Sequence, residues 1–181
     1  MIFNIYLFHS ELARKCHVPV ANVHNPVVWG NHGETQVPDM FHAYYIDPKT
    51  NQRVKIADKL PFDYLTGEFV HHISQRAWEV RNAKGHTSVA SAAMASVNQM
   101  HDWVFGTPDG EWASMGIPVP DNEPYGIKKG IIFSFSCTID KEGKYHVVEN
   151  LKLNKWVEDR LKITEDDLID ERNQAFSALA N

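Results

Sequence analysis

The sequence contains few residues that could cross-link the chain or bind a metal ion. Only two of its 181 residues are cysteines, Cys16 and Cys137, and they form no C-x-x-C pair. We therefore expect neither a disulfide framework nor a cysteine-based zinc site, and a reducing compartment fits better. The ten histidines include no H-x-x-x-H pair that shares a helix face with an acidic partner, so no metal site is expected.

Long apolar runs and clusters of basic residues are also missing. The apolar opening, residues 1–8, is too short to span a bilayer, and it lacks the basic start and cleavage site of a secretory signal. The net charge of −5 argues against a nucleic-acid partner. We expect neither a membrane nor a nucleic acid as partner, and we assign the protein to the cytoplasm by default.

Motifs for nucleotide binding and for serine hydrolases do not occur either. No G-x-G-x-x-G follows an apolar run, no G-x-x-x-x-G-K-[ST] is present, and Ser88 lies in no G-x-S-x-G. We therefore expect no dinucleotide fingerprint and no serine nucleophile. The composition, 43% hydrophobic and 23% charged, is typical of one globular domain.

The most informative segment that is present surrounds His32. The apolar run 27–29 lies between Pro26 and Gly30, which predicts a short buried strand. Beyond it, Gly30 and Gly33 flank His32 and allow a tight turn and the close approach of a ligand. An imidazole at the end of a strand can exchange protons with a bound substrate. On this pattern alone, a histidine beside glycine is more often a turn residue or a structural one.

Periodic patterns predict the elements around this segment. Residues 11–16 fit the last turns of a helix that Pro19 closes. Two strands are predicted at 40–46 and 52–56, and the turn at 47–51 would join them as a hairpin.

Two long helices are predicted in the middle of the chain. The first begins after Gly67 and is interrupted at 83–86, and the second is rich in alanine and runs from Thr87 and Ser88 to Gly106. Short strands at 112–117, 131–135 and 145–148 follow. The run 164–167 (Thr-Glu-Asp-Asp) is predicted to cap a last amphipathic helix, which completes one α+β domain.

Several short motifs follow one another along the chain in a fixed order. They are 28–34 (VWGNHGE), 67–70 (GEFV), 75–76 (QR), 87–88 (TS), 103–111 (WVFGTPDGE), 114–116 (SMG), 125–126 (YG) and 133–135 (FSF). The motifs and their order closely resemble the C-terminal catalytic domain of the lactate/malate dehydrogenases, in the cytosolic-type malate dehydrogenase branch. The resemblance implies an α+β fold of antiparallel strands packed with long helices for residues 11–181. Residues 1–10 would be a divergent N-terminal remnant.

The resemblance also implies a cofactor and partners. In this family an N-terminal Rossmann domain binds NAD, and the C-terminal domain carries the substrate site. The chain is similar to nearly all of the second domain and to none of the first, which agrees with the missing glycine fingerprint. NAD is the implied cofactor, although its binding domain is absent from this chain. The implied partners are a small 2-oxo or 2-hydroxy acid and further copies of the chain in a homo-oligomer.

By resemblance, His32 is the catalytic histidine, which donates a proton to the substrate oxygen or accepts one from it. The family supports this histidine with an aspartate that orients the imidazole and an arginine that clamps the substrate carboxylate. Counted back without gaps, the two positions fall on Asn4 and Leu7. Asn4 carries no negative charge and Leu7 no charge at all. Either residues 1–10 are a replacement sequence at the edge of a truncated gene, or the function has been lost.

Thr87 and Ser88 are the other site residues that the resemblance implies. In the family the start of this helix lines the substrate pocket, with a serine in cytosolic malate dehydrogenases and a threonine in lactate dehydrogenases. The serine position falls on Ser88 and the threonine position on Thr87. Alternatively, one of the two is only the N-cap of the long helix.

The sequence therefore leaves three alternative functions open. The first is an NAD-dependent malate dehydrogenase that interconverts malate and oxaloacetate, with activity impaired in this chain. The second is a lactate dehydrogenase that arose within the malate branch. The loop that would distinguish the two substrates lies in the half that is absent here. The third is a catalytic-domain remnant that folds or associates but turns nothing over.

Overall fold

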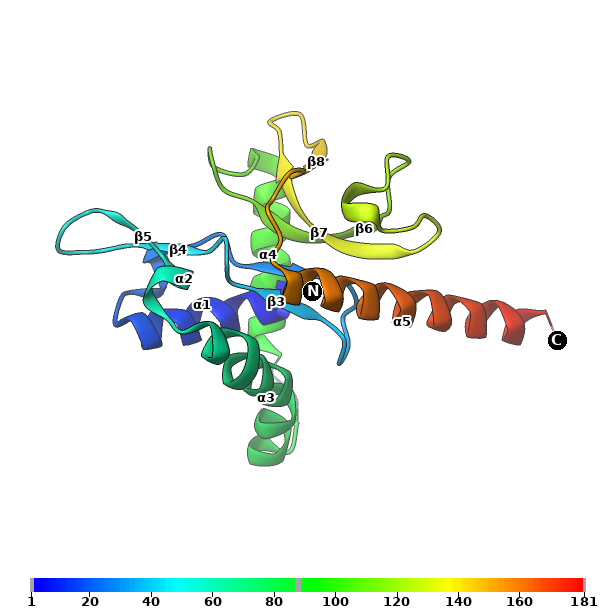
Figure 1. The fold of residues 1–181 in the computed structure, drawn as a ribbon, viewed down its shortest axis with the longest axis horizontal. Coiled ribbons are helices and arrows are strands. Elements are labelled where there is room, and N and C mark those ends of the chain that lie inside the picture. Colours follow the sequence, from blue (N-terminus) through cyan, green and yellow to red (C-terminus); the bar gives the residue numbers. More distant parts are fainter. Residues whose placement is uncertain (1, 87–88, 181) are drawn as a thin grey trace.

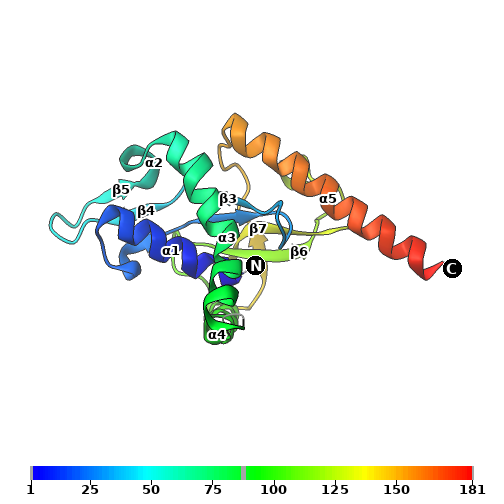
Figure 2. The same ribbon diagram turned by 90° about the horizontal axis from the view of Figure 1, so that it is seen from below.

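The computed structural model describes residues 2–86 and 89–180 and combines short strands with long helices (Figure 1). Helix α1 (Ile2–Cys16) packs against both α3 (Phe69–Lys84) and α4 (Ala90–Phe105). Helix α5 (Lys155–Leu179) begins against the strands, and its C-terminal half projects away from the rest of the molecule (Figure 2). This arrangement of antiparallel strands and long helices confirms the predicted α+β fold.

The largest sheet is antiparallel in the order β6–β7–β8. Strand β7 (Ile132–Ile139) lies between β6 (Ala113–Pro118) and β8 (Tyr145–Val147), with Met115 opposite Phe135. A hairpin of β2 (Val27–Trp29) and β3 (Val37–Asp39) joins this sheet through one antiparallel bridge between Gly30 and Ser134. The bridge fixes the carboxyl end of β2, where the His32 segment begins.

A second small sheet has the order β1–β4–β5. Its strands are β1 (Val23–His24), β4 (Tyr44–Ile46) and β5 (Arg53–Lys55). The pairing of β4 with β5 confirms the hairpin that the sequence predicts around the turn at 47–51. Three helical turns, η1 (Val20–Asn22), α2 (Ile56–Lys59) and the π-helical η2 (Tyr64–Glu68), connect this sheet to its neighbours. A further turn, η3 (Pro124–Gly126), lies between β6 and β7.

Strand β2 is buried along its whole length, as its apolar run predicts, because it lies between two hydrophobic cores. Val27 and Trp29 pack in the core formed with β6, β7 and the start of α5. Val28 points the other way, into the core formed by α1, α3 and the β4 strand. Successive side chains of a strand face opposite sides, so three apolar residues in a row are what such a position requires.

The structure contradicts the predicted start of the last helix. Helix α5 begins at Lys155, where the Asn154 side chain caps it by accepting a hydrogen bond from the Val157 amide at 3.0 Å. Thr164 lies inside the helix and is fully buried, so the run 164–167 is not a helix start. The prediction was wrong because Thr164, Glu165 and Asp167 pair with other segments of the chain rather than with their own helix end.

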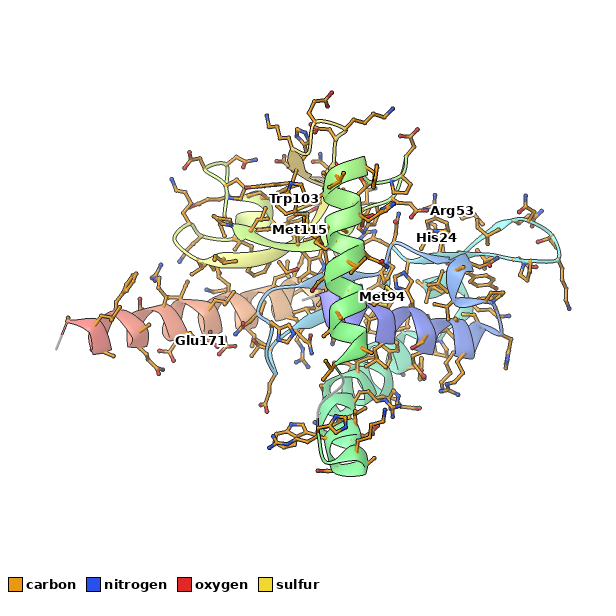
Figure 3. All side chains as sticks on the ribbon, turned by 180° about the vertical axis from the view of Figure 1, so that it is seen from behind. His24, Arg53, Met94, Trp103, Met115 and Glu171 are labelled. Carbon is orange, nitrogen blue, oxygen red and sulfur yellow. The ribbon has the colours of Figure 1, made fainter. Side chains whose placement is uncertain are left out.

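Helix α4 presents an apolar surface that the described chain leaves uncovered. Figure 3 shows α4 along the outside of the molecule, with Met94 and Trp103 on it. All residues of this helix are described, and among them only Ala95 is buried. Large apolar side chains that are more than half exposed define what we call the α4 face: Met94, Val97, Met100, Val104 and Phe105. Among the residues that the structure describes, no helix is long and apolar enough to cross a membrane.

Candidate active site

The His32 loop, residues 30–36, connects β2 to β3 and starts at a glycine that no other residue could replace without strain. Gly30 has φ +82°, a left-handed conformation that L side chains rarely adopt. A Cβ atom at this position would lie 2.2 Å from Cγ2 of Thr164. The absence of a side chain at Gly30 therefore lets α5 approach the loop directly.

Buried serines hold the strand that leads into this loop. The Val28 amide donates to Oγ of Ser114 at 3.0 Å, and Oγ of Ser134 donates to the Val28 carbonyl at 2.6 Å. The Gly30 amide and carbonyl bond to the carbonyl and amide of Ser134, both at 3.2 Å. Each of these polar groups is paired inside the core, so the base of the loop is fixed.

Behind the loop, Asp39 on β3 ties the hairpin together. The Trp29 indole donates from Nε1 to Oδ2 of Asp39 at 3.0 Å, and the Phe41 amide donates to Oδ1 at 2.9 Å. Asp39 is completely buried, and this burial raises the pKa of its carboxyl group above the ordinary value, although the neighbouring His42 opposes the shift.

The outer side of the loop is bound to α5. The Asn31 amide donates to Oγ1 of Thr164 at 2.8 Å. The Asn31 side chain donates from Nδ2 to Oδ2 of Asp167 at 3.1 Å and to Oε1 of Glu171 at 2.8 Å. The Thr35 hydroxyl donates to the same oxygen of Asp167 at 2.5 Å. The hydrogen bonds from Thr35 and Asn31 hold the pKa of Asp167 below its ordinary value.

His32 lies between these fixed points, and its side chain is exposed. The loop therefore holds its backbone on both sides while the imidazole remains accessible to a ligand from solvent. A histidine in such a position can act as a proton donor or acceptor toward a bound ligand, because one ring nitrogen can carry a proton while the other accepts one. The geometry fits acid–base chemistry on a small molecule bound over the loop.

The other predicted site residues cannot be joined to His32 in the same way. Thr87 and Ser88 lie outside the described residues, but the N-cap position of α4 is Val89, so the expectation that one of them is the N-cap was wrong. Asn4 and Leu7, the positions of the supporting aspartate and arginine, both lie on α1. Leu7 is partly buried and packs against the core that α1 shares with α3. An apolar contact therefore stands where the resemblance requires a guanidinium group.

The described residues do not fit a metal ion or a dinucleotide by themselves. Across residues 2–86 and 89–180, no group of three or more histidine, cysteine or acidic residues is placed to hold a metal. In the same part of the chain, no glycine-rich loop runs from a strand into a helix N-terminus, where a pyrophosphate would bind. NAD would therefore need a nucleotide-binding domain outside these residues.

The residues that hold the His32 loop were not identified from the sequence. The sequence pattern assigns no role to Asn31 or Thr35, and it predicts a helix cap at 164–167, which contains Thr164 and Asp167. The contacts join segments more than a hundred residues apart, which no local pattern reports. The one available signal was the polar run at 164–167 within an otherwise regular helical pattern.

Comparison with known proteins gives consistent results. The α/β C-terminal domain of the lactate/malate dehydrogenases matches residues 6–179. A malate dehydrogenase of Protochlamydia amoebophila is 36% identical over 168 residues, which are 93% of this chain and 49% of that protein.

Solved structures agree with the sequence matches. A lactate dehydrogenase of Trichomonas vaginalis, in complex with NADH and oxamate, has a TM-score of 0.94 and 43% identity over 99% of this chain and 54% of its own. A malate dehydrogenase of Naegleria fowleri has a TM-score of 0.82 and 32% identity over 96% of this chain and 50% of its own. The 181 residues thus span about half the length of these relatives.

Proposed function

The chain belongs to the lactate/malate dehydrogenase family as its α/β C-terminal domain, and from this premise we propose that it is the catalytic half of an NAD-dependent malate dehydrogenase. In this proposal it interconverts malate and oxaloacetate, and His32 exchanges a proton with the substrate oxygen. The observation that carries the proposal is the His32 loop, which fixes its backbone on both sides and leaves the imidazole exposed.

The chemistry assigned to His32 is a single proton movement. When oxaloacetate is reduced, a ring nitrogen of the imidazolium donates its proton to the carbonyl oxygen at C2 of the acid. When malate is oxidised, the neutral ring accepts the proton of the C2 hydroxyl group. A nicotinamide cofactor, when bound, would supply or take the hydride, and the residues of this chain would handle only the proton.

We propose that Thr87 and Ser88 complete the substrate side of the site. A hydroxyl group at either position could donate a hydrogen bond to a carboxylate of the acid. The assignment rests on the family resemblance. The alternative role, N-capping of α4, does not hold, because the N-cap position of this helix is Val89.

In this proposal, residues 1–10 diverge from the family and residues 11–181 form the catalytic domain. Leu7 offers no charge to a substrate carboxylate, and the loss of a bidentate charged contact costs substrate binding on the order of 2–5 kcal/mol. Asn4 has no charge with which to stabilise an imidazolium. We therefore propose that these two residues lower turnover without removing the proton exchange at His32.

The α4 face supports the proposed homo-oligomer. Val97 and Met100 are 61% and 60% exposed, and exposed apolar patches of this kind promote association. We propose that another domain or another copy of the chain covers this face in the working enzyme, which we place in the cytoplasm.

A lactate dehydrogenase is the second candidate function. Over the matched region, the Trichomonas vaginalis enzyme is 43% identical to this chain, against 32% for the Naegleria fowleri malate dehydrogenase. A non-catalytic remnant is the third candidate, and Asn4 and Leu7 favour it.

The experiment uses two hybrid proteins. Each hybrid joins the unmatched part of one relative to the front of this chain. In the Naegleria hybrid this part comes from the malate dehydrogenase, and in the Trichomonas hybrid it comes from the lactate dehydrogenase. NADH oxidation is measured with oxaloacetate and with pyruvate. We expect the Naegleria hybrid to reduce oxaloacetate, and His32→Asn to lower its kcat by about 100-fold or more.

Other outcomes separate the candidates. Faster reduction of pyruvate than of oxaloacetate by both hybrids would favour the lactate dehydrogenase. Folded hybrids that turn over neither acid would favour the remnant. Turnover that His32→Asn leaves unchanged would refute the role proposed for His32.

A further inference from the structure

We propose that helix α5 positions the imidazole of His32, with Thr164, Asp167 and Glu171 as the positioning residues. The inference rests on the proposed role of His32 and extends it to a part of the chain that contains no catalytic group. The three residues act through Asn31 and Thr35, which lie on either side of His32 along the loop.

The first argument is the register of the contacts along α5. Positions 164, 167 and 171 are three and four residues apart, so their side chains share one face of the helix. All three residues on this face contact the His32 loop. In Figure 3, Glu171 lies on the part of α5 that projects beyond the sheets.

The second argument is that neighbouring acidic residues on α5 have other partners. Asp166 pairs with the ammonium group of Lys162 on its own helix. Asp170 accepts a hydrogen bond from Nε2 of Gln174 at 2.6 Å. The contact with the loop is therefore specific to one face and is not a general property of an acidic helix.

The third argument is that α5 is itself fixed where it meets the loop. Leu161 is buried in the core that also contains Trp29. The nearly buried carboxylate of Glu165 accepts a hydrogen bond from the Lys128 amide at 2.7 Å. The loop is thus tied to a helix that cannot shift without disturbing the core.

The fourth argument is that Asn31 uses its backbone and side-chain donors for this attachment. Both hydrogens of the Asn31 side-chain amide are donated to carboxylates of α5, and its backbone amide goes to Thr164. Because Asn31 is bonded at three points, the backbone that carries the next residue has little freedom. The orientation of His32 therefore depends on side chains from the C-terminal helix.

The test uses the 181-residue chain itself and requires no catalysis. Backbone amide exchange at Asn31 and the imidazole Cε1–Hε1 signal of His32 are measured by NMR in four variants. Thr164→Val keeps the shape of the side chain but removes the acceptor, and Thr164→Ser restores it. Asp167→Asn removes the charge that Asn31 and Thr35 contact, and Asp170→Asn removes the same charge from another position on α5.

We expect Thr164→Val and Asp167→Asn to increase the exchange rate at Asn31 about tenfold or more, because hydrogen bonds of this kind limit local opening. Both should also shift the His32 signal, whereas Thr164→Ser and Asp170→Asn should leave rate and signal close to those of the unchanged chain. Unfolding curves of each variant show whether the global fold persists.

Equal effects of Asp167→Asn and Asp170→Asn, or an unchanged His32 signal in both Thr164→Val and Asp167→Asn, would overturn the proposal. If a variant at Thr164 does not fold, Asp167→Asn and Glu171→Gln carry the test alone. A hybrid that is inactive despite a normal exchange pattern would refute the proposed function but not the positioning by α5.

Discussion

The His32 loop and helix α4 meet their surroundings in opposite ways. The loop is a short irregular segment, yet strand β7 holds it from one side and helix α5 from the other. Helix α4 is regular and long, yet its large apolar side chains stay exposed along most of its length. The geometry of the loop is therefore encoded within this chain, whereas the described residues leave the α4 face uncovered.

The difference follows from the kind of interaction each segment uses. Hydrogen bonds to partners at fixed positions specify one conformation, and an unpaired buried group carries a penalty. Burial of apolar side chains is non-directional, so it stabilises contact with any surface of complementary shape. A catalytic loop requires the first kind of interaction, and a docking face can use the second.

The largest loss of stability is expected when the glycine at the start of the His32 loop is replaced. Gly30→Ala should lower the free energy of unfolding by about 3 kcal/mol or more, because the new Cβ meets Thr164 and φ is positive. The matched control is Gly85→Ala. Gly85 has φ +75°, but a Cβ atom there would meet no atom within 4 Å, so this change should lower the free energy of unfolding by only about 1 kcal/mol. Urea unfolding of both variants measures the contrast, and equal losses would show that α5 does not constrain the loop.

A smaller effect is expected from the buried carboxylate behind the loop. Burial raises the pKa of Asp39. The folded state therefore keeps the proton at pH values where the unfolded state has lost it, and stability is lost as pH rises from about 4 through the raised pKa. Asp39→Asn removes this dependence but leaves one donor, from Trp29 or Phe41, without its acceptor, at about 1–3 kcal/mol.

Unfolding by urea between pH 4 and pH 7 checks this prediction. The loss caused by Asp39→Asn should be largest near pH 4 and should become smaller as pH rises. A loss that stays constant or grows with pH would mean that Asp39 is ionised throughout this range.

A substitution in the α4 face should hardly change the stability of the chain but should clearly reduce its self-association. Val97→Asp places a charge in the exposed apolar face, so the free energy of unfolding should change by less than about 0.5 kcal/mol. Sedimentation velocity should show a smaller average mass than for the unchanged chain. Asn173→Asp adds the same charge on the exposed part of α5 and should leave the mass unchanged. A monodisperse monomer before any substitution would contradict this account of the face.

The sequence predicted local structure better than it predicted contacts between distant segments. The buried strand at 27–29, the hairpin around 47–51 and the two central helices follow from spacing and turn residues, and the structure contains all of them. The helix start at Thr164 was wrong because a threonine before acidic residues has the same local pattern in a cap and in a buried contact. Only the tertiary fold distinguishes the two.

The candidate site shows the same limit. His32 was identified from its flanking glycines and from a family resemblance, both of which are local. Its attachment to Asp167 and Glu171 depends on the path of a helix that begins more than a hundred residues later. The α4 face was predictable in part, since its apolar residues are visible in the sequence, but their exposure depends on what the rest of the chain covers.

The most direct test of the central claim restores the two residues that the resemblance requires. The claim is that the His32 loop of this chain is competent and that Asn4 and Leu7 limit the site. In the Naegleria hybrid, Asn4→Asp combined with Leu7→Arg should raise kcat/KM for oxaloacetate by about 30-fold or more, because a charged carboxylate clamp is regained. This gain should disappear when His32→Asn is added. A folded double variant with no gain, or with a gain that survives His32→Asn, would contradict the account.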